Sequence, residues 1–379
     1  MTKEKESHKL PSLDGWRAVS IALVLAAHST YATGFPAALK PALTKWFDAG
    51  AVGVGFFFVI SGFLITYLLI QEQARNGAVD LKKFYIRRAL RILPIYGVYL
   101  VVLGCFTHYT QSGAAWAANL TFTTNFFWSP FPTAHLWSLG VEEQFYLIWP
   151  WFVFFLLCCS RDAKKLLHVL LAVIVAAPII RVMACKHWYP NGWEALFNTG
   201  SFFVHFDTLA YGCAGAVLFK YWREMMERFY AKHFLMTAVV ALVLVFVPTA
   251  IKLLHLPARV EALLADSAQA LGFTLLLVQS ILYPVRGFYR ALNWNWMRHL
   301  GILSYSIYIW QQMFPGTAMT VFGRADAWWT NFPWWILAVL VVAHASYYLM
   351  ERPLLGLRAK FRSAPVEAVV PADSKFNHG

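Results

Sequence analysis

The chain has 379 residues, of which 59% are hydrophobic and only 13% are charged, and its mean hydropathy is +0.52. Soluble globular domains have about a quarter of charged residues, so this composition excludes an ordinary soluble protein. The formal net charge of +13 would suit nucleic-acid binding only if the basic residues gathered on one surface, and the distribution described below argues against that.

Ten apolar segments are long enough to cross about 30 Å of hydrocarbon. We expect the spans at 15–33, 50–70, 90–108, 138–158, 166–185, 201–220, 234–254, 265–283, 299–321 and 333–351. Pro315 falls inside the ninth segment and is expected to kink it or end it early. The sequence therefore predicts an all-α integral membrane protein, a bundle of about ten transmembrane helices.

The basic residues predict the orientation of these spans. Of the 32 Lys and Arg residues, 24 lie in the segments 1–10, 71–91, 159–168, 220–233, 284–298 and 350–379. Because Lys and Arg are enriched in cytoplasmic loops, we expect both termini in the cytoplasm and no nucleic-acid partner. The excess positive charge then lies along the inner membrane surface.

No domain boundary interrupts the ten segments. We expect a cytoplasmic N-terminus at 1–10, one transmembrane domain at 11–357, and a disordered cytoplasmic tail at 358–379 that is rich in Ala, Pro and Val. The first apolar run has no cleavage-site pattern before it and is expected to be retained as a span. The five cysteines form no Cys-x-x-Cys pair, so we expect no metal site.

The first span carries three strongly polar side chains, Asp14, Arg17 and His28. Eleven residues separate Arg17 from His28, about three turns, so both lie on one stripe roughly 16 Å apart. Asp14 stands three residues before Arg17, close enough to pair with it. Imidazole is the side chain best suited to accept a proton near neutral pH, although a lone membrane histidine also serves simply to bind a backbone carbonyl.

Basic residues cluster at the inner start of the third span. Arg87, Arg88 and Arg91 precede Leu93-Pro94 in the segment LKKFYIRRALRILPIY. Guanidinium groups at this depth suit the phosphates of a nucleotide-like ligand. Contact with lipid headgroups explains the same pattern equally well.

The segment HLWSLGVEEQFYLIWP opens the fourth span with four polar side chains: His135, Ser138, Glu142 and Glu143. Ser138 and Glu142 share a helix face near His135, while Glu143 pairs with Tyr146. A carboxylate inside a membrane costs about 2.5–3.5 kcal/mol on insertion scales, so such groups face the bundle interior and usually have a function. The alternative is that they only bind neighbouring helices. Tyr305 and Tyr308 in the ninth span line either a cavity or a packing seam.

The segments described above, taken in their order along the chain, resemble the acyltransferase 3 family of integral membrane O-acyltransferases. The resemblance extends from about residue 10 to 357. The segments that carry the resemblance are LDGWRAVSIALVLAAH, GVGFFFVISGFLIT, FYIRRALRILPIY, HLWSLGVEEQFYLIWP, LGILSYSIYIW and YYLMERPL. Two positions depart from the family, which often has His where this chain has Gln311 and Asp where it has Gly55.

The resemblance implies a multi-pass enzyme of the bacterial cytoplasmic (inner) membrane. It would move an acyl group, usually acetyl, from cytoplasmic acyl-CoA to a hydroxyl of a glycan or glycolipid at the outer side, with acetyl-CoA as donor substrate and no bound cofactor. Some relatives add an extracytoplasmic hydrolase-like domain, which we do not expect in a chain of this length.

The family motifs fall on Arg17 and His28, on Arg88 and Arg91, and on Ser138 with Glu142 or Glu143. We expect the catalytic residues to be His28, Glu142, Glu143 and Arg17, with His28 as general base or transient acyl carrier and one of the glutamates orienting it. Arg17, Arg87, Arg88 and Arg91 would bind the acyl-CoA. Asp14, His135, Ser138, Tyr146, Tyr305 and Tyr308 are expected to support this path. The alternatives are a transporter or flippase of a glycan or lipid, which would use the same polar stripes for permeation, and a non-catalytic assembly partner.

Overall fold

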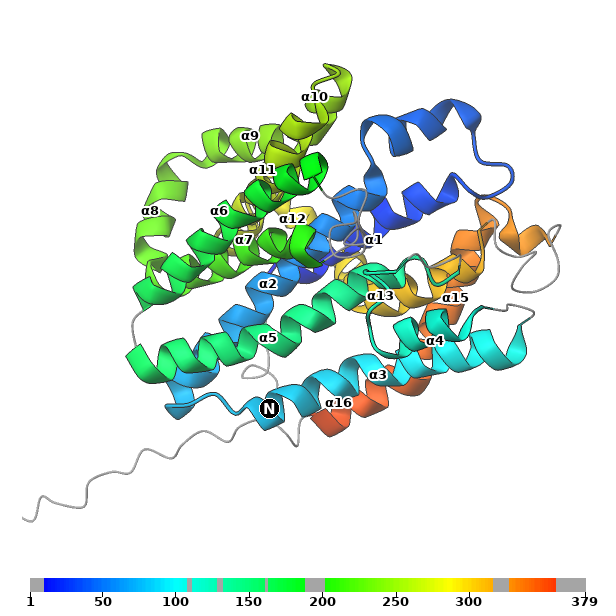
Figure 1. Cartoon of the computed structure of the whole chain (residues 1–379), viewed down its shortest axis with the longest axis horizontal. Coiled ribbons are helices and arrows are strands. Elements are labelled where there is room, and N and C mark those ends of the chain that lie inside the picture. The colour runs from blue at the N-terminus through cyan, green and yellow to red at the C-terminus, as the bar shows by residue number, and fades with distance from the viewer. Residues whose placement is uncertain are drawn as a thin grey trace, which may run out of the picture.

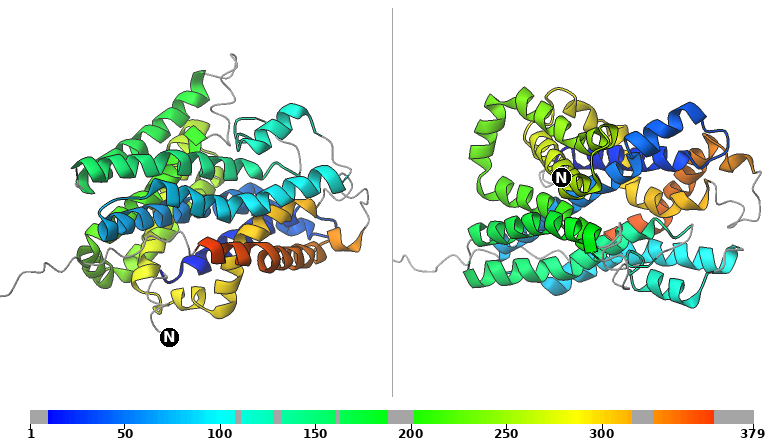
Figure 2. Two further views of the ribbon diagram at one scale, coloured as in Figure 1. Left: turned by 90° about the horizontal axis from the view of Figure 1, so that it is seen from below. Right: turned by 45° about the horizontal axis from the view of Figure 1, so that its top comes forward.

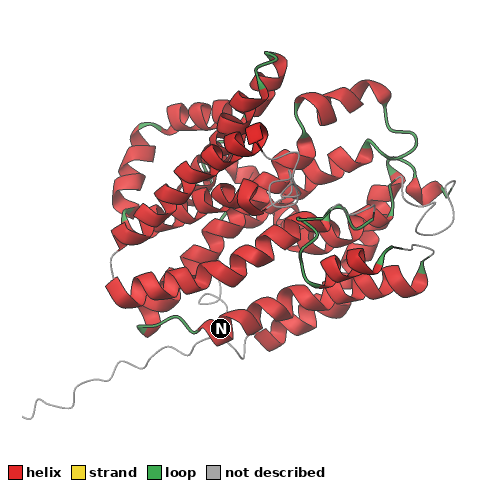
Figure 3. Ribbon diagram, in the orientation of Figure 1, coloured by secondary structure: helices red, strands yellow, loops and turns green. Residues whose placement is uncertain are grey.

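The computed structural model describes residues 10–107, 111–127, 132–160, 163–187, 202–315 and 327–358. Every regular element in these ranges is a helix, and Figure 3 draws no strand among them. The predicted all-α fold is confirmed for this part of the chain. The predicted N-terminus 1–10 and tail 358–379 lie, apart from Leu10 and Arg358, outside the described residues.

Figure 1 shows the order and arrangement of the helices. The longer ones are α1 (Leu13–Ser29), α2 (Ala49–Asn76), α3 (Leu81–Phe106), α5 (Leu136–Ser160), α6 (Ala163–His187), α7 (Phe202–Tyr221), α8 (Arg223–Lys232), α9 (Phe234–Val245), α11 (Ala258–Leu282), α13 (Asn295–Trp310) and α15 (Trp334–Ser346). The shorter ones are α4 (Gly113–Leu120), α10 (Val247–Leu253), α12 (Tyr289–Leu292) and α16 (Arg352–Arg358). Single 3₁₀ or π turns occupy Ala37–Leu39, Ala42–Trp46, Gln311–Met313, Trp328–Thr330 and Tyr347–Glu351.

Several of these helices have the length and hydropathy of membrane spans. In the described ranges six qualify alone: Ala49–Asn76, Leu81–Cys105, Lys164–Met183, Phe202–Tyr221, Ala258–Leu282 and Trp334–Leu357. A seventh results if α8 and α9, which meet at 94° (Figure 2), form one crossing. The chain is thus a multi-pass membrane protein, while the count of about ten spans and the cytoplasmic termini stay predictions. The helices α1 and α13, with 17 and 16 residues, are shorter than the 18 or more residues typical of a span.

Two predicted spans have different bounds in the structure. The segment 234–254 consists of two helices, α9 and α10, which are separated at Phe246. Pro248, near the start of α10, has no backbone N–H and cannot continue the hydrogen bonding of α9. The segment 299–321 is α-helical only as far as Trp310 and continues as a 3₁₀ turn at Gln311–Met313; its residues 316–321 lie outside the described part of the chain.

The helix α2 packs against α1, α5, α7 and α11. Its contact with α7 depends on two glycines. A Cβ atom added to Gly62 would lie 2.1 Å from the carbonyl oxygen of Leu209, and one added to Gly212 would lie 2.1 Å from that of Val59. Small residues let membrane helices approach this closely, so the two glycines fix α2 and α7 backbone to backbone.

A buried ion pair joins α6 to α7. Arg181 and Asp207 form two hydrogen bonds of 2.9 Å, and their side chains are only 5% and 0% exposed. Arg181 also donates to the backbone oxygens of Val204 and Ala262 and to Ser267 Oγ. All five guanidinium N–H groups therefore have acceptors, which is what allows a charge to stay in the bundle interior.

Candidate functional site

A cavity enters the bundle between α1, α2, α3, α5 and α13. It contains about 1160 Å³ of empty space, part of it open to solvent. On α2 its lining runs from Val54 to Glu72, which corresponds to about 27 Å along the helix axis. The cavity therefore extends over most of the thickness of a membrane.

Most of the predicted site residues line this cavity. Four are the arginines Arg17, Arg87, Arg88 and Arg91. The others are Ser138, Glu142, Tyr146, Tyr305 and Tyr308. Since Glu72 and Glu142 are the acidic residues of the described lining, four arginines against two glutamates leave a net charge of +2. Asp14, His28, His135 and Glu143 lie outside the lining.

Arg88 lies between the two adjacent glutamates of α5. Its Nη2 is 3.4 Å from Glu143 Oε1 and 3.7 Å from Glu142 Oε2, and its guanidinium stacks 3.5 Å from the ring centroid of Tyr146. The three charged side chains are only 17–19% exposed. Arg88 Nε is buried and has no hydrogen-bond partner in the described part of the chain. The guanidinium is thus held in place with one donor still available.

The other charged groups are also held by neighbours. Ser61 Oγ donates to Glu142 Oε1 at 2.6 Å, and Arg87 Nη2 donates to Glu72 Oε2 at 2.8 Å; all four residues line the cavity. The predicted pairing of Asp14 with Arg17 is confirmed, at 3.5 Å. Sequence reasoning did not pair Ser61 or Glu72 with these groups, because no local spacing connects either to its partner.

Two hydroxyl groups close the cavity at its other end. The hydroxyl of Ser138 donates to that of Tyr308, which in turn donates to the backbone oxygen of His135 at 2.8 Å; Ser138 Oγ lies 3.2 Å from the same oxygen. The ring of Tyr308 meets the ring of Phe57 at 6.3 Å. These hydroxyl groups form a polar wall between the cavity and His135.

Behind this wall, the side chain of Gln312 connects two histidines. Gln312 Nε2 lies 3.2 Å from His28 Nε2, so the amide donates and the imidazole accepts. Gln312 Oε1 accepts from the backbone N–H of His135 at 3.3 Å and lies 3.1 Å from its Nδ1. The other ring nitrogen of His135 is 3.1 Å from the backbone oxygen of Ile309. Gln312 therefore fixes the orientation of both rings.

The hydrogen bond from Gln312 defines the tautomer of His28. With Nε2 accepting from Gln312, the neutral ring carries its proton on Nδ1. The contacts recorded for Glu142 and Glu143 are with Ser61 and Arg88. Their predicted part in orienting His28 stays a prediction.

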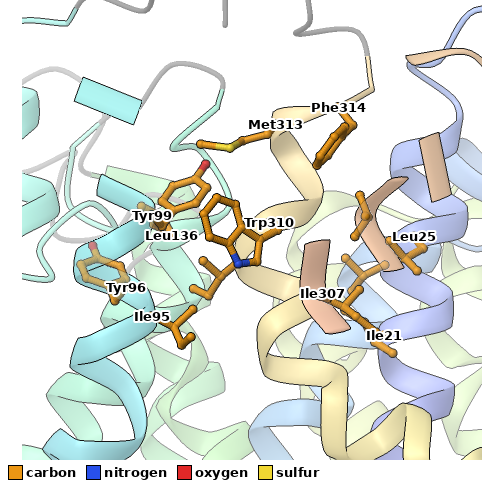
Figure 4. Close-up of a cluster of buried hydrophobic side chains, with 14 of the residues drawn as sticks. Ile21, Leu25, Ile95, Tyr96, Tyr99, Leu136, Ile307, Trp310, Met313 and Phe314 are labelled. Atoms are coloured by element: carbon orange, nitrogen blue, oxygen red, sulfur yellow. The ribbon is translucent and has the colours of Figure 1, made fainter. Parts of the chain in front are cut away.

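His135 lies next to a buried apolar cluster from α1, α3, α5, α13 and α15, part of which is drawn in Figure 4. The ring of Tyr99 stands 5.7 Å from the ring of His135 and 5.6 Å from that of Trp310. In Figure 4, Ile21, Leu25 and Ile307 gather at one side of this cluster. Such packing restrains the rings that it touches and keeps bulk water away from the polar network.

No group of three or more potential metal ligands comes together within the described ranges. The chemistry that the arrangement offers is that of guanidinium, carboxylate, hydroxyl and imidazole groups. Such a set can bind an anionic ligand at one end of the cavity and can transfer a proton at the other.

Comparisons with known proteins show which family the chain belongs to. A family model described as an acyltransferase domain matches residues 10–351. The peptidoglycan O-acetyltransferase OatA of Listeria monocytogenes is 25% identical over 370 residues, which cover 91% of this chain and 56% of OatA. A Bacillus subtilis protein named "Putative peptidoglycan O-acetyltransferase YrhL" is 26% identical over 382 residues, which cover 93% of this chain and 56% of the relative.

The chain spans about half the length of these curated relatives. No solved structure matches it. The family match begins just before α1 and ends at Glu351, just before α16, and so contains the whole cavity and the histidines behind it. The chain therefore belongs to the acyltransferase 3 family.

Proposed function

We propose that this protein is a membrane O-acyltransferase that moves an acetyl group from acetyl-CoA on the cytoplasmic side to a hydroxyl of a glycan at the outer side. It would act in the cytoplasmic membrane of a bacterium, with residues 11–357 as the transferase domain. Two relatives from bacteria are named as peptidoglycan O-acetyltransferases, which supports a glycan acceptor.

The observation that carries this proposal is the shape and charge of the cavity. It extends about 27 Å along α2 and carries its four arginines toward the end that the basic loops predict to be cytoplasmic. Acyl-CoA has charged phosphates at one end and a thin apolar arm that leads to the thioester. A long cavity with a basic entrance and an apolar middle suits both parts of such a donor.

The arginines differ in the part that they can take. Arg87 lies beside Glu72, at the end of the cavity lining on α2 that we expect to face the cytoplasm. Arg88 faces two carboxylates, whereas Arg87 and Arg17 each pair with one, so Arg88 adds less attraction. In this proposal all four arginines bind the donor, and Arg88 with its two carboxylates also fixes the shape of the channel.

The reaction needs a base for the acceptor hydroxyl. For this step Gln312 has to release His28 Nε2, so that its lone pair becomes free. The oxygen of the acceptor then attacks the carbonyl carbon of the thioester while His28 Nε2 takes the proton, and the carbon–sulfur bond breaks. The imidazolium returns that proton to the departing CoA thiolate. A positioned general base contributes about 10²- to 10⁴-fold to such a rate.

The wall of Ser138 and Tyr308 has to open during this cycle, because it separates the cavity from His28. We propose that Tyr308 turns away when both substrates are bound. The movement breaks its hydrogen bonds to Ser138 and to the backbone of His135, and either hydroxyl can then bind the oxyanion of the transition state.

The test uses purified full-length protein in nanodiscs with radiolabelled acetyl-CoA and chitotetraose, and without any membrane gradient. We expect label to appear on the sugar with wild-type protein and with His344→Ala, a control at an exposed histidine of α15. We expect His28→Ala to lose at least a hundredfold in rate while its membrane insertion stays normal.

Unchanged turnover by His28→Ala would refute the role given to His28. A wild-type protein that moves glycan or lipid across the bilayer, but never releases CoA, would instead support the transporter alternative.

A further inference from the structure

A second pocket lies at the opposite end of the bundle from the arginines. It contains about 400 Å³ of empty space and is lined near the starts of α2, α5 and α7 and in the middle of α11. Part of this space is open to solvent. In the predicted orientation this pocket, which we call the outer pocket, faces away from the cytoplasm.

The lining combines aromatic rings with a few polar side chains. The ring of Trp137 lies 6.1 Å from that of Phe58 and 5.2 Å from that of His205. His205 Nδ1 is 4.0 Å from Asp266 Oδ2. Gln269 uses its Nε2 to bind the backbone oxygen of Val245 at 3.1 Å, which leaves its Oε1 on the side of Gly55.

These groups indicate the chemical class of the ligand. Aromatic faces pack against the C–H faces of a sugar ring, while a carboxylate, an amide oxygen and an imidazole bind its hydroxyl groups. Among the described residues that line the outer pocket there is no arginine or lysine. With Asp266 as its charged group, the pocket disfavours an anion such as a nucleotide and favours a neutral polyhydroxylated ligand.

The outer pocket adjoins the acyl-donor cavity. Val54 and Phe58 line both spaces, and they stand four residues apart on one face of α2. The start of α5 also contacts both spaces, because Trp137 lines the outer pocket and the next residue, Ser138, lines the donor cavity. A ligand in the outer pocket is therefore separated from the donor cavity by the thickness of one layer of side chains.

From these observations we infer that the outer pocket binds one sugar ring of the acceptor glycan and presents a hydroxyl group of that ring toward the donor cavity. The inference rests on the proposed transferase function for the reaction. The recognition of a sugar by the pocket rests on the lining alone, and so the two can be tested separately.

Gly55 offers a way to fill the pocket without disturbing the helices. A Cβ atom added there would lie 3.5 Å from Gln269 Oε1 and 3.7 Å from Phe273 Cε2, which are ordinary contacts. A leucine side chain at this position would extend into the outer pocket. Gly97 of α3 provides the matched control, because an added Cβ there meets nothing within 4 Å.

The experiment measures the binding of chitotetraose to full-length protein in nanodiscs, for wild type, Gly55→Leu, Gly97→Leu and Asp266→Asn. We expect Gly55→Leu to raise the dissociation constant at least tenfold, Asp266→Asn to raise it about threefold to tenfold, and Gly97→Leu to leave it unchanged. Thermal melting and size-exclusion profiles like those of wild type establish that the variants are folded.

Acetyl transfer with the same variants separates the two proposals. If the wild-type protein transfers acetyl to chitotetraose, Gly55→Leu should raise the KM for the sugar at least tenfold and leave the KM for acetyl-CoA within twofold. Wild-type protein that does not bind chitotetraose, or Gly55→Leu that binds it as well as wild type does, would overturn the inference. Sugar binding that Gly55→Leu abolishes, without any transfer by wild type, would support the pocket and refute the transferase.

Discussion

Replacing each of two neighbouring glutamines with leucine should have opposite effects. Gln311 and Gln312 follow α13 directly and are 0% and 3% exposed. Gln312 bonds His28 and His135 through its amide. The side-chain nitrogen and oxygen of Gln311 are buried and find no hydrogen-bond partner in the described part of the chain.

The expected changes in the free energy of unfolding follow from the polar groups that each substitution removes or leaves without a hydrogen-bond partner. Gln312→Leu leaves the backbone N–H and the Nδ1 of His135 without their acceptor, at a cost of about 1–3 kcal/mol for each buried group. It also releases His28, so we expect kcat to fall tenfold to a hundredfold while the KM for acetyl-CoA stays unchanged. Gln311→Leu removes two unpaired polar atoms and should be neutral or stabilising by about 1–3 kcal/mol.

The assay is thermal melting of both variants in nanodiscs, together with acetyl transfer from acetyl-CoA. We expect the midpoint temperature to fall for Gln312→Leu and to stay or rise for Gln311→Leu. Shifts of the same sign and size in the two variants would refute the reasoning, because they would show that burial alone, and not the hydrogen bonds to the histidines, decides the outcome.

Three further predictions concern charged residues. Arg88→Ala leaves two glutamates unpaired and should lower the free energy of unfolding by about 3–5 kcal/mol and raise the KM for acetyl-CoA. An acetyl-CoA titration that gives the wild-type KM would place the donor elsewhere. Arg181→Met should lower the free energy of unfolding by a similar amount, and the double variant Arg181→Met/Asp207→Leu should lower it much less, as measured by thermal melting. Equal losses of stability in the two variants would contradict a buried ion pair. Asp80 caps α3 by accepting from the Lys83 N–H, which lowers the pKa of Asp80. Its stabilisation is therefore present above the unfolded pKa of about 3.9 and is lost as the pH falls through the lower folded pKa. Asp80→Ala should speed exchange of the Lys83 amide at pH 7, and this difference from wild type should disappear as the pH falls through the folded pKa.

Spacing within one helix predicted well which residues act on the same face. The interval of three residues correctly paired Asp14 with Arg17. The stripe of Tyr305 and Tyr308 does line a cavity, as one of the two predicted alternatives required. These successes have a common cause, since the pitch of a helix fixes the relative directions of its own side chains.

Contacts between distant helices were harder to predict. Gln312 is 284 residues from His28 and 177 from His135, and no periodicity reports how far α13 is rotated against α1. For the same reason the ionic contact of the α5 carboxylates with Arg88 of α3 was not predicted. The outer pocket, built from four helices, had no signal in the sequence for the same reason.

The pairing of Arg181 with Asp207 has a consequence for how the chain is made. Either residue alone would enter the lipid as a bare charge, at a cost of about 2.5–3.5 kcal/mol on insertion scales. Their helices, α6 and α7, follow one another along the chain, so the partner of Arg181 is synthesised soon after it. We expect the translocon to retain α6 until α7 emerges from the ribosome and to release the two together as a hairpin.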